Sequence, residues 1–227
     1  MRVAVAILAL LLAACQQGGG EAGFHNDQGI EALAEDRYDA ARISFEKALD
    51  MNPNDAVVWG NLGVALTRLE AYDKALAAYT KAVELDPREP VTVAEIGSLL
   101  YRMGRYPEAE ARFREAIGLV KTAPEFHSSL SLALRRQGRI GEADAELGAA
   151  LDVAEKNWRR HGVVKYHLAA SHVLKGEMEQ ALGAFAESLE TYPPGARAAV
   201  SDPDFAPLYD NPRFQELVGG WWKRAEP

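Results

Sequence analysis

The feature that most constrains the fold is a step of 34 residues that runs through most of the chain. Small residues recur at this step at Ala41, Ala75, Ala109 and Ala143, and Ala181 follows after 38 residues. Large apolar residues keep the same steps at Phe45, Tyr79, Phe113, Leu147 and Phe185. A fixed period of this length is typical of repeat architectures, in which each unit buries its apolar face against its neighbours.

The spacing within each unit predicts two helices. Apolar residues fall at three- and four-residue intervals, which places them on one helical face. Small residues stand where two backbones approach, and large residues fill the space beside them. Asn52-Pro53 and Asp86-Pro87 each end one helix, because proline cannot continue a helix interior. We therefore expect an all-α chain of five helical hairpins, in the units 22–55, 56–89, 90–123, 124–157 and 162–195.

The second unit carries the most complete motif of the five. It contains, in order, Trp59-x2-Leu62-Gly63-x2-Leu66, then Ala75-x3-Tyr79-x2-Ala82 and Pro87. This pattern resembles the tetratricopeptide repeat. The resemblance covers residues 22–195 and implies a right-handed α-solenoid that binds other proteins.

Two segments depart from the regular repeat. Four additional residues near Trp158 to His161 equal about one helical turn, and we expect them to lengthen the second helix of unit 124–157. Residues 196–227 resemble a capping segment, in which Asn211 is a good N-cap and Pro212 suits the first helical position. We expect three apolar residues of this cap to cover the open end of the fifth unit: Phe205, Phe214 and Leu217.

The N-terminus has the composition of an export signal. Residues 1–14 carry one Arg and an apolar run that is too short to span a bilayer. Leu12-Ala13-Ala14-Cys15 resembles the lipobox of bacterial lipoproteins, which implies cleavage before Cys15, its lipidation, and a flexible linker over residues 15–21. An ordinary signal peptide cut near Ala14 is the alternative. In the lipoprotein family, Asp after the cysteine is the common signal for retention in the inner membrane. Gln16 stands there instead, which favours the outer membrane, facing the periplasm, if the source has two membranes.

The resemblance to tetratricopeptide repeats also implies a concave groove, lined by the first helix of each unit, for partner peptides or helices. Carrying the groove positions onto this chain gives Asn61, Arg68, Glu95, Tyr101, Arg102, Ser128, Arg135, Arg136, Tyr166 and His167. Arg68, Arg102 and Arg136 share one repeat position and predict a basic stripe, to which Arg135 adds. Such a stripe suits an acidic segment or a C-terminal carboxylate, but arginine near a helix C-terminus also complements the helix dipole.

Composition and motifs argue against several functions. A net charge of −8 disfavours nucleic-acid binding, and the chain shows no phosphate-binding loop and no cofactor motif. We expect no metal site, because the sequence shows no cluster of Cys, His and carboxylate residues. His25 and His127 take the repeat position of Trp59 in unit two and are explained by packing. Trp221 and Trp222 could contact a membrane surface, but packing onto the cap explains them better.

These observations predict a non-enzymatic scaffold, tethered to the membrane through Cys15, that binds other envelope proteins and needs no cofactor or small-molecule substrate. Two alternatives remain open at this stage. The solenoid could be an accessory, substrate-holding component of an envelope enzyme or assembly machine, such as one for pilus or outer-membrane biogenesis. It could also be a structural protein that self-associates.

Overall fold

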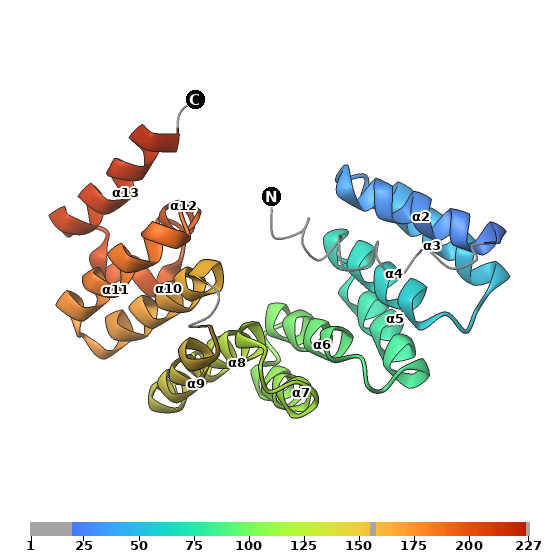
Figure 1. The fold of residues 1–227 in the computed structure, drawn as a ribbon, viewed down its shortest axis with the longest axis horizontal. Coiled ribbons are helices and arrows are strands. Elements are labelled where there is room, and N and C mark those ends of the chain that lie inside the picture. Colours follow the sequence, from blue (N-terminus) through green and yellow to red (C-terminus); the bar gives the residue numbers. More distant parts are fainter. Residues whose placement is uncertain (1–19, 155–157, 226–227) are drawn as a thin grey trace. The chain divides into compact units, whose positions relative to one another are not determined.

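The computed structural model describes residues 20–154 and 158–225 as two compact units, one ending at Arg105 and one beginning at Tyr106. Within these residues every regular element is a helix and no strand is present (Figure 1). The prediction of an all-α solenoid of paired helices is confirmed. The expected signal segment at 1–14, Cys15 and the linker up to residue 19 lie outside the described residues.

The first unit is built from five helices. These are α2 (Glu21–Ala34), α3 (Tyr38–Met51), α4 (Ala56–Arg68), α5 (Tyr72–Leu85) and α6 (Pro90–Arg102). Helix α2 pairs with α3 and α4 pairs with α5, while α3 packs on α4 and α5 packs on α6. Each hairpin therefore buries its apolar surface partly against the next one, as expected of a repeat protein.

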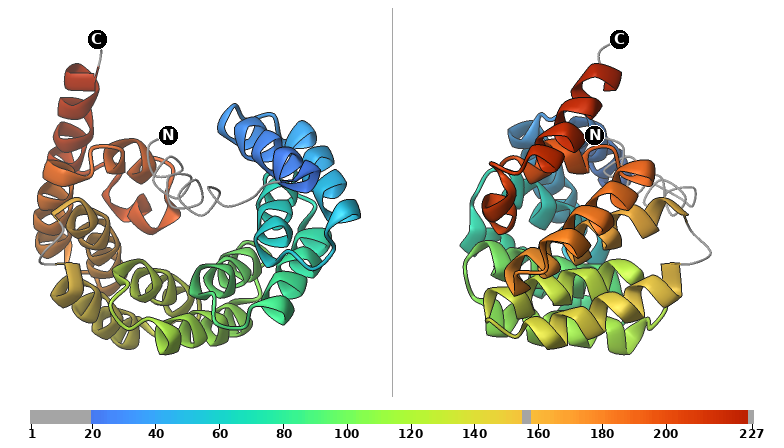
Figure 2. Two further views of the ribbon diagram at one scale, coloured as in Figure 1. Left: turned by 45° about the vertical axis from the view of Figure 1, so that its right-hand side comes forward. Right: turned by 90° about the vertical axis from the view of Figure 1, so that its left-hand side faces the viewer.

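The second unit continues the pattern and adds the C-terminal segment (Figure 2). Its elements are α7 (Tyr106–Leu119), α8 (Pro124–Arg136), α9 (Ile140–Ala154), α10 (Trp158–Lys175), α11 (Met178–Thr191), α12 (Gly195–Ala199), the 3₁₀ helix η1 (Pro203–Leu208) and α13 (Pro212–Ala225). Helices α8 and α9 form one hairpin, and α10 and α11 form another. Within this unit η1 packs on α10, and α13 contacts α11 and α12.

The expectation for the four additional residues is wrong about which helix they lengthen. Helix α9, the second helix of the fourth hairpin, has 15 residues. Helix α10, the first helix of the fifth hairpin, has 18 residues and begins at Trp158. The additional turn thus precedes the repeat pattern of the fifth unit, where no apolar repeat position marks it in the sequence.

A residue with left-handed backbone follows each of the helices α2, α4, α6, α8 and α10. Asp36 and Glu70 both have a φ of 58°, and glycine takes the same repeat position after α6, α8 and α10, at Gly104, Gly138 and Gly176. In the first hairpin this conformation lets the Arg37 N–H donate to the Ala32 carbonyl at 2.8 Å. The closure satisfies carbonyls at the helix end and turns the chain toward the second helix.

The small and large residues of the repeat meet as the sequence predicts. A Cβ atom added to Gly63 would lie 2.6 Å from the ring of Tyr79, and one added to Gly29 would clash with the ring of Phe45. Tyr79 is 2% exposed and Phe45 is fully buried, so neither ring has space to withdraw. Glycine is therefore required at these two positions for the close approach of the paired helices.

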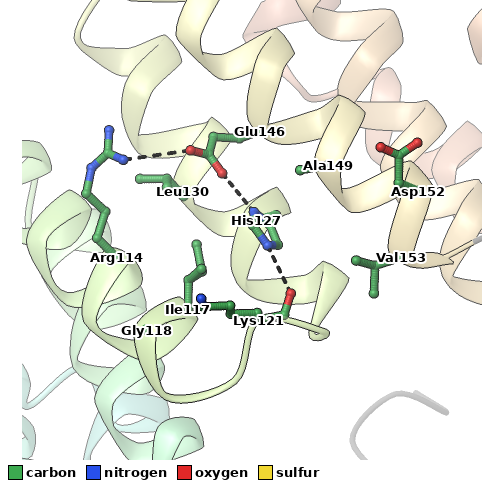
Figure 3. A pocket seen from close by; sticks show the side chains of 10 residues that line it. All are labelled: Arg114, Ile117, Gly118, Lys121, His127, Leu130, Glu146, Ala149, Asp152 and Val153. Carbon is green, nitrogen blue, oxygen red and sulfur yellow. Dashed lines mark hydrogen bonds and ion pairs between the residues drawn. The ribbon is translucent and has the colours of Figure 1, made fainter.

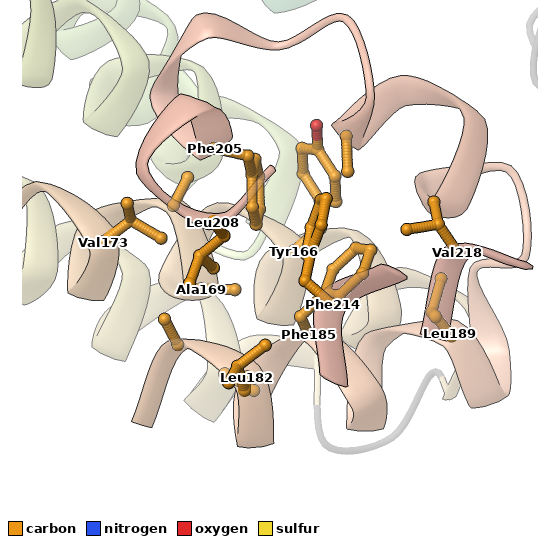
Figure 4. Packing of buried hydrophobic residues seen from close by; sticks show 14 of the residues in the cluster. Tyr166, Ala169, Val173, Leu182, Phe185, Leu189, Phe205, Leu208, Phe214 and Val218 are labelled. Atoms are coloured by element: carbon orange, nitrogen blue, oxygen red, sulfur yellow. The ribbon is translucent and has the colours of Figure 1, made fainter. Parts of the chain in front are cut away.

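The C-terminal segment closes the end of the second unit with aromatic rings (Figure 4). Phe205 and Phe214 are buried against Phe185, each with a ring-centroid distance of 5.3 Å. Phe205 also lies 5.1 Å from Tyr166. Leu217 is partly buried against the same cluster. This packing agrees with the expected cap, whereas the side chains of Trp221 and Trp222 lie outside those described.

Candidate functional site

The first unit places its predicted groove residues on α4 and α6. Asn61 lies in the interior rather than on the surface, and its Nδ2 donates to Asn26 Oδ1 at 3.0 Å. Both asparagines are buried. A buried amide pair of this kind satisfies two polar groups and links α2 to α4, so Asn61 fixes the hairpins rather than offering a free ligand contact.

Arg68 and Arg102 are the accessible cations of this unit's predicted groove. Each occupies the last turn of a first helix, α4 and α6 respectively. Both residues are exposed, and neither guanidinium forms an ion pair with any residue between 20 and 154 or between 158 and 225. Their donors are therefore available to an external acceptor, and guanidinium groups bind carboxylates through two parallel hydrogen bonds.

Glu95 contributes the opposing charge near these arginines. Burial raises the pKa of the Glu95 carboxyl, while Arg68 and Arg102 act in the opposite direction. Burial, followed by the charge of Glu95, also raises the pKa of Tyr79. Tyr101 is half-buried in the same helix as Glu95. Two arginines and one carboxylate therefore act on one another around α6.

In the second unit, the arginines at the predicted groove positions form ion pairs within the chain. The Arg135 side chain is only 1% exposed, and its Nη2 lies 3.1 Å from Asp204 Oδ2. Its Nη1 also donates to the His167 carbonyl at 2.7 Å. Arg136 donates through Nη1 to Asp204 Oδ1 at 2.5 Å. Both cations therefore bind an acid of the chain's own C-terminal segment.

The other groove residues predicted in this unit are also part of the interior. Tyr166 donates to Asp202 Oδ2 at 2.9 Å and stands in the aromatic cluster of the cap. Ser128 is buried and donates to the Pro124 carbonyl, one turn earlier in its own helix. Burial, and then the charge of Arg135, lowers the pKa of His167 to about 3, so its ring is neutral at physiological pH.

The expectation that Arg135 extends an exposed basic stripe is therefore wrong. The segment from Asp202 to Phe205 occupies this part of the predicted groove and supplies both carboxylates. It lies outside the repeats, so carrying positions from one repeat to another could not reveal it. The acidic pattern Asp202-Pro203-Asp204-Phe205 was the only signal of this arrangement in the sequence.

A concave feature outside the predicted groove lies between α7, α8 and α9 (Figure 3). It is an open cleft of about 550 Å³. His127 Nδ1 lies 2.8 Å from Glu146 Oε2, and Arg114 lies 3.7 Å from the other oxygen of Glu146. In the sequence, packing alone explained His127, and no motif marked the cleft.

Other kinds of site receive no support from the residues described. Within residues 20–154 and 158–225, no three His, Cys, Asp or Glu side chains gather in a way that could hold a metal ion. No helix in this part of the chain has the length and apolar character needed to cross a bilayer.

Comparisons with known proteins agree with the helical hairpins. A family model described as the tetratricopeptide repeat matches residues 26–90, 95–155 and 130–196. A search of curated proteins finds no match.

Several solved structures share the fold. MamA (41-end) from Desulfovibrio magneticus RS-1 gives a TM-score of 0.64 at 18% identity, covering 76% of this chain and 96% of that one. A chain of the APC/C hetero-tetramer Cut9–Hcn1 gives 0.74 at 18% identity, covering 95% of this chain and 42% of that one. YrrB, described as a TPR protein with an unusual peptide-binding site, gives 0.53 at 22% identity, covering 79% and 89%.

Proposed function

Because the chain belongs to the tetratricopeptide-repeat family, we propose that it is a membrane-anchored adaptor of the bacterial cell envelope that binds acidic segments of other envelope proteins. Members of this family are protein-interaction scaffolds and are typically not enzymes. The likeness to a peptide-binding repeat protein, YrrB, is consistent with a peptide or helix as the ligand.

The main support for this binding site is that the arginines at the predicted groove positions are paired in the second unit but, among the residues described, unpaired in the first. Arg135 and Arg136 are engaged by Asp204 of the same chain, whereas Arg68 and Arg102 are exposed and form no ion pair within the described residues. We assign partner binding to the first unit, with these two arginines as the contacts for carboxylates. The bond between Arg136 and Asp204 illustrates the chemistry, since the same repeat position binds an acid there.

Membrane anchoring rests on the sequence of the first 15 residues. An apolar run followed by Leu12-Ala13-Ala14-Cys15 supports cleavage and lipidation at Cys15. Two or more acyl chains give stable anchoring, whereas a single chain binds a membrane reversibly. The glutamine at position 16 supports the outer membrane, with the solenoid in the periplasm, if the source has two membranes.

Crosslinking in intact cells followed by mass spectrometry tests the binding site. The test variant is Arg68→Glu with Arg102→Glu, and the matched control is Lys74→Glu with Arg88→Glu. The control reverses two exposed cations of the same unit that lie outside the predicted groove positions. Envelope partners lost only from the test variant would support the proposal. Identical partner sets for wild type and both variants would refute it.

Fractionation with fatty-acid labelling tests the anchor. The wild-type protein is expected in the membrane fraction with label incorporated, and Cys15→Ala is expected to lose the label. Labelled Cys15→Ala protein, or an unlabelled wild type released in soluble form, would contradict lipidation at Cys15.

A further inference from the structure

The cleft of the second unit has a physical origin that the repeat makes visible. His127 takes the repeat position that Trp59 takes in the second hairpin. The Trp59 Nε1 donates to the Pro53 carbonyl at 2.8 Å, and His127 Nε2 lies 3.4 Å from the carbonyl of Lys121, which is the position equivalent to Pro53. The imidazole thus reproduces the polar contact of the indole but occupies less volume.

Two further lining positions are also smaller than their equivalents. Gly118 stands where the first two repeats have Asp50 and Glu84. Ala149 stands where four other repeats have long charged side chains, at Lys47, Lys81, Glu115 and Glu187. A Cβ atom added to Gly118 would meet nothing within 4 Å. The three reductions together leave a space where the second repeat has an indole and other repeats have longer side chains.

Apolar side chains form much of the wall of this cleft. Ile117, Leu130 and Val153 line it together with Ala149 (Figure 3). Leu119 and Val120, which follow Gly118 in the chain, are 40% and 36% exposed. The volume of the cleft, about 550 Å³, falls within the ~300–1,000 Å³ typical of ligand clefts.

The charges around the cleft divide into paired and unpaired groups. Glu146 is held by His127 and Arg114, and Arg114 also binds Glu110 at 3.0 Å. The Lys121 ammonium forms no ion pair with any residue that the structure describes, and neither does Asp152. In Figure 3 these two residues lie well apart around the cleft. An incoming group near Lys121 therefore meets an uncompensated positive charge.

We propose that this cleft, outside the predicted groove, is a second docking site that receives an aromatic side chain of a partner protein, with an acidic neighbour of that residue bound by Lys121. Aromatic residues dominate the binding energy of protein interfaces because they bury a large area in well-packed pockets. The indole of Trp59 at the equivalent repeat position shows the size and polarity that such a site accommodates. The ammonium of Lys121 is positive, so it favours a negative charge on the partner residue next to the aromatic one.

The test is binding of fluorescently labelled peptides to the purified full-length chain. The probe is a short peptide containing Trp-Glu, and the comparison peptides carry Ala-Glu or Trp-Lys. We expect saturable binding of Trp-Glu, and weaker binding of both others. Lys121→Glu should weaken Trp-Glu binding by about two- to fivefold, as expected for an exposed ion pair.

Filling the cleft should abolish the binding. His127→Trp restores the side chain of the second repeat and should weaken Trp-Glu binding at least about tenfold, since the anchor loses its pocket. His25→Trp makes the same change at the equivalent position of the first repeat and should leave binding unchanged. Because His127→Trp could disturb folding, Ala149→Lys provides a second way to fill the same space.

The outcomes separate this site from the groove. Loss of binding in either folded cleft variant, with retention in His25→Trp and in Arg68→Glu with Arg102→Glu, supports a separate docking site. No saturable binding to wild type, or equal binding by the filled variants, overturns it. Loss in the Arg68 and Arg102 variant alone would place the peptide in the groove instead, which also overturns the cleft proposal.

Discussion

Replacing Gly63 by alanine should destabilise the first unit, although alanine is the better helix former. The added Cβ would lie 2.6 Å from two atoms of the Tyr79 ring and 2.8 Å from a third. Tyr79 is 2% exposed, so the ring cannot move aside without displacing other buried groups. Overpacking of this severity costs about 3 kcal/mol. The gain in helix propensity returns about 1 kcal/mol, which leaves a net loss of about 2 kcal/mol.

The same helix provides a matched control for this substitution. A Cβ added to Gly60 would meet only Thr92 Oγ1, at an ordinary contact distance of 3.7 Å. Gly60→Ala should therefore stabilise the protein by about 0.5–1 kcal/mol through helix propensity alone. Urea unfolding followed by circular dichroism measures both changes. Opposite signs for one substitution at two sites of α4 would isolate the steric effect from the propensity effect.

A second-site change tests whether the ring of Tyr79 causes the loss. In the Gly63→Ala background, Tyr79→Leu should cost less than it does in wild type, since the smaller side chain makes room for the added methyl group. A double-mutant cycle measures this coupling. Equal stability of Gly63→Ala and Gly60→Ala would refute the reasoning and would mean that the repeat register does not place these two helices in close contact.

Three further predictions concern the polar groups of the two units. Asp204→Asn should destabilise the second unit by about 3–5 kcal/mol in urea unfolding, because it removes the carboxylate that faces the buried Arg135. The control is Glu179→Gln, at an exposed ion pair, which should change the free energy of unfolding by less than about 1 kcal/mol. Burial raises the pKa of Glu95, so the folded state binds a proton at this carboxyl more tightly than the unfolded state does. Protonation of Glu95 therefore stabilises the fold below the ordinary pKa of 4.5, and this stabilisation is lost as the pH rises through the raised pKa. Glu95→Gln should thus stabilise the protein at neutral pH and lose this advantage below pH 4.5, and a constant difference across that range would contradict it. The His167 ring should stay neutral in an NMR titration down to a pH of about 3, and its stabilising effect should be lost as the pH falls from 6.5 toward 3; protonation near 6.5 would show that the ring is accessible to water.

Much of the fold could be predicted because the repeat makes its contacts locally. The pairing of Gly63 with Tyr79 lies within one hairpin, and the same step along the chain reproduces it for Gly29 with Phe45. Helix ends followed equally local signals, such as the Asp55 side chain, which accepts hydrogen bonds from two backbone N–H groups of α4. The additional turn on α10 was misplaced because only packing decides which of two consecutive helices absorbs four residues.

The candidate sites depended on contacts that repeat positions do not encode. Arg136 and its partner Asp204 are 68 residues apart, and the second of them lies beyond the last repeat. The transfer of groove positions assumes that every unit keeps its groove open, whereas here the chain's own η1 segment fills part of it. The cleft beside His127 arises in the opposite way, because Gly118 and Ala149 are smaller than their equivalents in other repeats and His127 is smaller than Trp59.

The two explanations for Arg68 and Arg102 make different demands on the side chain. Interaction with the helix dipole requires only a positive charge in the last turn, which lysine supplies as well as arginine. Recognition of a carboxylate by two parallel hydrogen bonds requires the planar guanidinium. Arg68→Lys with Arg102→Lys should therefore retain the thermal stability of the wild type but lose acidic partners in the crosslinking experiment. If the lysine variant keeps both its partners and its stability, interaction with the helix dipole is sufficient to explain arginine at this repeat position. That result would refute the binding of acidic segments through the guanidinium groups of these two residues.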